Sequence, residues 1–123
     1  MAIELNHTIV PARDPDASAQ FLADILGLAV DPPVSHFTPV TLANHVTLDY
    51  DQHDDVEAHH YAFLVSEEEF DAAFARNKDR GVIFFADPAG RQAGQIYHGK
   101  GARRGTHFRD PGGHLMEILT PAG

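Results

Sequence analysis

A weak internal repeat constrains the fold of this chain more than any other feature. His7 and His60 lie 53 residues apart (60 − 7 = 53), and the same shift places one phenylalanine on another. Each half begins with a strand-like segment that carries a histidine and ends with one that carries a carboxylate, Asp49 or Glu117. Two such halves, related by a pseudo-twofold axis, could bring the four side chains to one centre. Imidazole and carboxylate groups bind divalent metals, so the repeat predicts a metal site.

The pattern of apolar residues predicts the order strand, helix and three strands in each half. Asp14 before Pro15 is a favourable helix start, and the first helix should cover residues 15–26. Ser66 and Glu69 have the spacing of a capping box, so a second helix should follow and end near residue 80. The expected strands are 5–10, 28–30, 36–42 and 45–51, and then 59–65, 82–86, 104–109 and 114–120, with a short hairpin near 95–98.

Composition narrows the class of protein. A chain of 123 residues, 43% of them hydrophobic, is long enough for one domain with a core of its own. The chain has no cysteine, which excludes disulfides and thiolate ligands, so any metal must be held by nitrogen and oxygen atoms. No apolar stretch approaches the roughly 20 residues of a membrane helix, and no signal peptide is visible, so we expect a cytoplasmic protein without a membrane partner.

Charge argues against a nucleic-acid partner, because the net charge is −9 and such proteins carry a basic face. Basic residues gather instead in a glycine-rich segment of the second half, at Arg91, Lys100, Arg103 and Arg104. Two interpretations stay open for this cluster. It is either a solvated loop or a local anion site near the metal.

Three segments resemble the vicinal oxygen chelate superfamily, also called the glyoxalase/bleomycin resistance/dioxygenase family. They are residues 5–10, residues 60–65 and residues 110–118, and the last contains an Asp-Pro-Gly-Gly-His sequence followed by Glu117. The resemblance covers nearly the whole chain. It implies a single α+β domain over residues 1–123, built from pseudo-repeats 1–52 and 58–123. Its two βαβββ modules would form a cupped eight-stranded mixed sheet with helices on the outer face. It also implies a homodimer.

The resemblance also implies a ligand set of His7, Asp49, His60 and Glu117 for a divalent ion such as Zn, Ni, Mn, Co or Fe. Glu117 lies in an apolar strand, where a carboxylate without a partner is costly to bury, and this favours a ligand role. Asp49 is one methylene shorter than the glutamate common at its position, so it is either a ligand, an outer acceptor or a general base. The other histidines, including His107 and His114, lack repeat partners and are expected at the surface or outside the ligand set.

Several functions suit this set, and all involve a small-molecule substrate. The leading hypothesis is a glyoxalase-like lyase or isomerase, in which the metal binds two substrate oxygens and Glu117 or Asp49 moves a proton. Alternatives are an Fe(II) extradiol-type dioxygenase, a fosfomycin-type thiol transferase, and a metal-free protein that confers resistance by binding a drug. Residues of the glycine-rich segment could contact substrate, because such loops often cover a site. These candidates are Tyr97, His98, Lys100 and Arg103.

Overall fold

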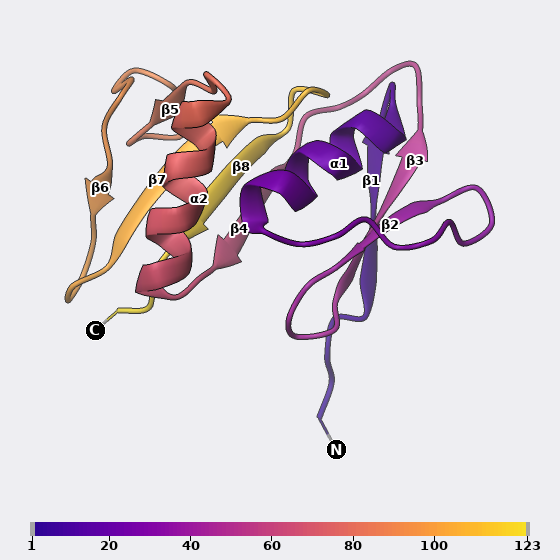
Figure 1. Ribbon diagram of the computed structural model, residues 1–123, viewed down its shortest axis with the longest axis horizontal. Helices are drawn as coiled ribbons and strands as arrows, with labels where there is room; N and C mark the ends of the chain where they lie inside the picture. Colours follow the sequence, from indigo (N-terminus) through magenta and orange to yellow (C-terminus); the bar gives the residue numbers. More distant parts are fainter. Residues whose placement is uncertain (1, 123) are drawn as a thin grey trace. The chain divides into compact units, whose positions relative to one another are not determined.

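The computed structural model describes residues 2–122 and divides them into two compact units, one up to Glu57 and the other from Ala58 onward (Figure 1). Each unit consists of one helix and one sheet with both parallel and antiparallel pairs. The α+β class expected from the sequence is therefore confirmed. None of the helices within residues 2–122 is long and apolar enough to cross a membrane.

The first unit is a three-stranded sheet with the order β1-β3-β2. Its elements are β1 (His7–Ala12), α1 (Pro15–Leu26), β2 (Thr38–Thr41) and β3 (Thr47–Gln52). Strand β3 pairs in parallel with β1 and antiparallel with β2. Helix α1 contacts all three strands and buries the side of the sheet that carries Val10, Leu48 and Tyr50. The opposite side carries His7 and Asp49, because side chains alternate along a strand.

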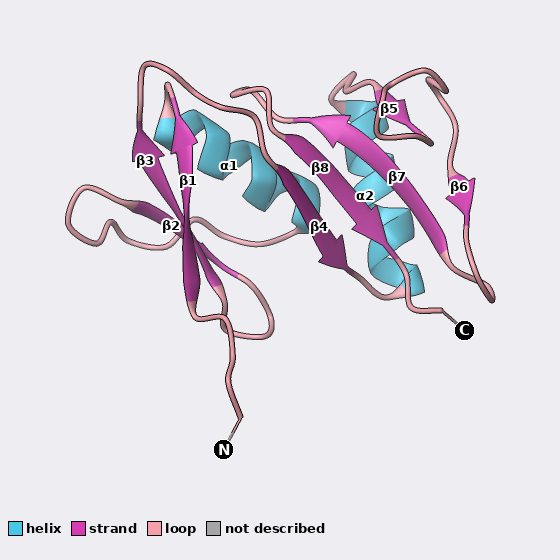
Figure 2. Ribbon diagram, turned by 180° about the vertical axis from the view of Figure 1, so that it is seen from behind, coloured by secondary structure: helices cyan, strands magenta, loops and turns pink. Residues whose placement is uncertain are grey.

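The second unit is a five-stranded sheet with the order β4-β8-β7-β5, and β6 also pairs with β7. Its elements are β4 (His60–Leu64), α2 (Glu67–Asp79), β5 (Phe84–Phe85), β6 (Tyr97–His98), β7 (Arg104–Arg109) and β8 (Leu115–Leu119). Helix α2 lies behind β7 and β8 in Figure 2. Phe70, Phe108, Met116 and Ile118 are fully buried and form the core of this unit.

The number of strands agrees with the prediction, but their distribution does not. Residues 28–30 were expected to form a strand, and Val30 makes only an isolated bridge to Val40. Pro32 and Pro33 follow directly, and proline has no backbone N–H to continue a ladder. The second unit gains a strand instead, because β6 of the glycine-rich segment pairs antiparallel with β7, the next strand along the chain, and forms a hairpin with it.

Both helices begin where the sequence predicts. The Asp14 side chain accepts a hydrogen bond from the Ala17 N–H at 3.1 Å, and Gly27 ends α1 in the left-handed conformation, with φ of 72°. The capping box of α2 is complete, since Ser66 Oγ accepts from the Glu69 N–H and the Glu69 carboxylate accepts from the Ser66 N–H, each at 3.1 Å.

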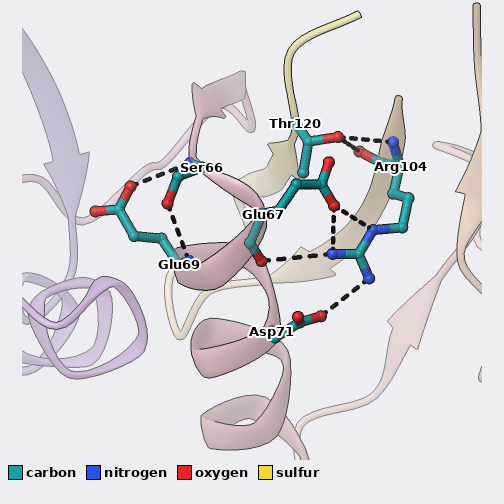
Figure 3. A network of polar contacts seen from close by, with 6 residues as sticks. All are labelled: Ser66, Glu67, Glu69, Asp71, Arg104 and Thr120. Atoms are coloured by element: carbon teal, nitrogen blue, oxygen red, sulfur yellow. Dashed lines mark hydrogen bonds and ion pairs between the residues drawn. The ribbon is translucent and has the colours of Figure 1, made fainter. Parts of the chain in front are cut away.

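Arg104 ties helix α2 to strand β7 (Figure 3). Its guanidinium donates to Glu67 Oε1 at 2.8 Å and to Asp71 Oδ1 at 2.9 Å, and it lies over the ring of Phe70. Exposed pairs of this kind contribute at most about 1 kcal/mol each, so the network orients the helix more than it stabilises it. The Arg104 guanidinium thus forms its ion pairs on the helix side of the sheet. This argues against the interpretation that Arg104 binds an anion near the metal.

The cap of α2 should contribute measurably to stability. Replacing Ser66 with alanine removes the acceptor for the Glu69 N–H, and we expect a loss of about 1 kcal/mol in the free energy of unfolding. Urea denaturation followed by circular dichroism measures this loss. Glu68→Ala is the control, because Glu68 is an exposed residue of the same turn. Equal effects of the two substitutions would contradict the assignment of the cap.

Candidate metal centre

The face of the second sheet turned away from α2 carries the candidate centre. Along β4, His60, Ala62 and Leu64 are exposed while Phe63 between them is buried. Along β8, Glu117 lies between the fully buried Met116 and Ile118 and points to the same face as His60. The alternation of side chains is therefore sufficient to place His60 and Glu117 on one surface.

Glu117 has three polar neighbours on this face. Its Oε1 lies 2.9 Å from His60 Nε2 and 3.2 Å from His107 Nε2. Its Oε2 accepts a hydrogen bond of 2.5 Å from the Tyr97 hydroxyl. The two carboxylate oxygens are thus differentiated, one facing two imidazoles and the other held by a phenol.

Burial and charge keep the Tyr97 hydroxyl protonated. The pKa of Tyr97 is raised above its ordinary value of 10.0, first by desolvation and then by its hydrogen bond to Glu117 and the charge of that residue. Arg103 acts in the opposite direction and lowers the pKa, but its effect is smaller. Tyr97 therefore acts as a hydrogen-bond donor throughout the neutral range.

The cluster of His60, His107 and Glu117 fits a divalent ion. The ligand atoms that these residues offer all lie within 4.8 Å of one another. Metal–ligand bonds of about 2.1 Å place neighbouring ligand atoms about 3.0–3.4 Å apart. The distance of 3.2 Å from His107 Nε2 to Glu117 Oε1 lies in this range, and the distance of 2.9 Å from His60 Nε2 lies just below it. Two histidines and one carboxylate are also the set that holds non-heme Fe(II) with positions open to substrate.

His107 was expected to lie outside the ligand set, and the structure places it inside this cluster. It is 4% exposed, and its direct partner across the β7–β8 pairing is Glu117. A signal for this position was present in the sequence. The turn at residues 110–114 joins two strands, and counting outward from it by equal steps pairs residue 107 with residue 117.

The second nitrogen of His107 distinguishes it from an ordinary metal ligand. Its Nδ1 is buried, and no residue within the described part of the chain forms a hydrogen bond with it. A metal-binding histidine almost always donates its other N–H to an acceptor, which fixes its tautomer. The structure therefore supports a position of His107 next to the metal centre more strongly than a role of His107 as a metal ligand.

His114 holds the backbone just before strand β4, which begins at His60. It is fully buried, and its Nδ1 accepts a hydrogen bond of 2.9 Å from the backbone N–H of His59. Its own backbone N–H donates to Asp110 Oδ1 at 2.8 Å. The Asp110 turn, which joins β7 to β8, is thereby connected to the residue that precedes His60.

His7 and Asp49 lie in the first unit, where they line a hollow of about 470 Å³ together with Asp31 and Thr41. His7 is exposed, and its Nδ1 lies 2.7 Å from Asn6 Oδ1. This bond orients the ring and leaves Nε2 as the nitrogen for a metal. The structure thus brings together two predicted ligands in each unit, His7 with Asp49 and His60 with Glu117.

The four predicted substrate contacts have different surroundings in the structure. Tyr97 bonds to Glu117, whereas Arg103 donates from Nε to the carbonyl of Thr120 at 2.8 Å and so supports the end of β8. His98 and Lys100 are exposed. Their contact with substrate stays a prediction.

Comparison with known proteins gives the family. The family model described as "Glyoxalase/Bleomycin resistance protein/Dioxygenase superfamily" matches residues 4–118. The chain belongs to this superfamily. No curated protein matches the chain significantly.

Two solved structures share about half of their residues with the chain. "Oxidase ChaP-H2" is 51% identical, with 100% of this chain and 98% of that chain covered and a TM-score of 0.94. "Oxidase ChaP-H1" is 50% identical, with coverage of 98% and 97% and the same TM-score. The fosfomycin resistance protein FosX from Listeria monocytogenes is 22% identical, with coverage of 98% and 95% and a TM-score of 0.75, which shows the shared fold alone.

The Tyr97 hydroxyl should titrate late in metal-free protein. Its raised pKa means that the phenol favours folding below the ordinary value of 10.0, and this contribution is lost as the pH rises through the higher folded value. The pKa of Tyr61 is also raised by burial, so we expect absorbance at 295 nm to show late-ionising tyrosines and Tyr97→Phe to remove one of them. Glu117→Gln should lower the pKa of Tyr97. An unchanged titration in Glu117→Gln would contradict the hydrogen bond.

Proposed function

We propose that the protein is a divalent-metal-dependent oxidase that uses dioxygen to oxidise a small substrate with two neighbouring oxygen atoms, such as a catechol. The observation that carries this proposal is the 51% and 50% identity to two proteins named oxidases, over nearly the full length of both chains. A lactoylglutathione lyase from Agrobacterium tumefaciens is 16% identical, and FosX is 22% identical. Likeness at that level supports the fold but not a lyase or transferase activity.

His60 and Glu117 would hold the ion together with His7, and a set of two histidines and one carboxylate suits iron. When bound, such an ion supplies Lewis-acid binding of the substrate oxygens and electron exchange with dioxygen. In ring opening of a catechol, a carbon–carbon bond breaks and both atoms of dioxygen enter the product, so no further reductant is needed. Tyr97 would keep Glu117 oriented through Oε2, and the buried His107 ring, 3.2 Å from Glu117 Oε1, would be the group to hold a proton during the reaction.

His7 would complete the proposed ligand set, with Asp49 as a fourth ligand or as a general base. Support for His7 comes from its bond to Asn6, which prepares Nε2 for a metal, whereas His107 has no partner for Nδ1 within residues 2–122. Asp49 remains either a ligand or a general base, and Glu117 or Asp49 would carry any proton transfer. We further propose that residues 1–123 act as one domain in a cytoplasmic homodimer. Light scattering on purified protein tests the dimer.

Metal titration should separate the two possible ligand sets. We expect His7→Ala, His60→Ala and Glu117→Gln each to weaken zinc binding at least about 100-fold, because each removes a ligand. His107→Phe should weaken binding less than about 10-fold. Competition with a chromophoric chelator measures the affinities, and His36→Ala, an exposed histidine, is the control.

The reverse result would identify a different centre. Full affinity in His7→Ala together with a large loss in His107→Phe would assign the metal to the cluster of the second unit alone. Retention of binding in both His60→Ala and Glu117→Gln would contradict the proposed site as a whole.

Oxygen uptake tests the reaction. Iron-loaded protein with a catechol substrate should consume dioxygen and incorporate ¹⁸O from ¹⁸O₂, and Glu117→Gln should lower the rate at least about 100-fold. High iron occupancy without oxygen uptake on a panel of catechols and enediols would contradict the proposal. Isomerisation of a hemithioacetal would then favour the glyoxalase-like lyase. Thiol addition to fosfomycin would favour the transferase, and tight drug binding by metal-free protein would favour the drug-binding resistance protein.

A further inference from the structure

Tyr97 reaches Glu117 by lying across a glycine on the neighbouring strand. Tyr97 on β6 is the direct partner of Gly105 on β7. A Cβ atom at position 105 would overlap Cζ, Cε2 and the hydroxyl oxygen of Tyr97, so no other residue fits there without moving the ring. The absence of a side chain at this buried position is therefore a condition for the Tyr97–Glu117 hydrogen bond.

The hydrogen bond gives the two carboxylate oxygens of Glu117 different partners. Oε2 accepts a hydrogen bond of 2.5 Å from the Tyr97 hydroxyl, whereas Oε1 faces the Nε2 atoms of His60 and His107. A carboxylate held in this way offers one oxygen, in one direction, to an ion. Partners of metal ligands that fix orientation in this manner typically change metal affinity about 10- to 100-fold.

We propose that Gly105 and Tyr97 are positioning residues, in which Gly105 makes room for the Tyr97 ring and the Tyr97 hydroxyl turns Oε1 of Glu117 toward the metal position. This inference deepens the proposed function and rests on it for the effect on metal binding. It does not depend on which further ligands complete the set.

The position of the ring can be tested without metal. The chain contains three tyrosines, so protein labelled with 3-fluorotyrosine should give three ¹⁹F resonances, and Tyr97→Phe assigns one of them. We expect Glu117→Gln and Gly105→Ala each to shift the Tyr97 resonance. Gly99→Ala is the matched control in the same segment, because a Cβ there would meet Arg103 Cδ at an ordinary 3.5 Å.

Zinc affinity tests the consequence. Tyr97→Phe keeps the ring and removes only the hydroxyl, and we expect it to weaken zinc binding about 10- to 100-fold. Gly105→Ala should weaken binding to a similar extent, and Gly99→Ala should not. The double variant Gly105→Ala/Tyr97→Phe should bind zinc no more weakly than whichever single variant has the lower zinc affinity. Both changes remove the same hydrogen bond, so their effects should not add.

The outcomes separate this inference from the proposed function. If wild-type protein binds no metal, the proposed function fails, while the ¹⁹F experiment still decides whether Gly105 sets the position of Tyr97. An unchanged Tyr97 resonance in folded Gly105→Ala would overturn the inference whatever the metal result. Wild-type zinc affinity in Tyr97→Phe, or additive losses in the double variant, would also overturn it.

Discussion

The pairing of β7 with β8 is the interaction on which the candidate centre depends. It places His107 directly opposite Glu117, and on the other side of β7 the ladder brings Tyr97 of β6 against Gly105. The turn between the two strands sets this register, with Asp110 accepting from the His114 N–H and Gly113 at a φ of 93° that favours glycine. A slip of one residue would turn Glu117 into the core.

The core of the second unit explains why this register is stable. Met116 and Ile118 flank Glu117 and are fully buried beside α2, so the alternating strand has only one orientation that keeps them from water. Glu117 then lies on the opposite face as a partly covered carboxylate. Burial of such a group is tolerable only with donors, which His60, His107 and Tyr97 provide.

The superfamily supports several chemistries on one fold, so the fold does not select among them. Identity is more informative here. Likeness near 20% accompanies a lyase and a fosfomycin resistance protein, whereas identity near 50% accompanies proteins named oxidases. The local features of the site then become the relevant evidence, above all a carboxylate whose two oxygens have different partners.

The sequence by itself determined the elements that depend on neighbours along the chain. Helix starts follow from Asp14 and from Ser66 with Glu69, and the face of each strand follows from alternation, which is enough to place His60 and Glu117 on one side of a sheet. The repeat and the final motif were also sufficient to predict the α+β class and the superfamily.

Tertiary structure decided what depends on contact between strands. Pairing between strands places His107 in the cluster and lays the Tyr97 ring over Gly105. It also divides the strands into one sheet of three and one of five. Residue spacing predicts which face a side chain takes, but only the register between strands decides which side chain it meets. For that reason the chain alone indicated His60 and Glu117, and the fold added the residues that surround them.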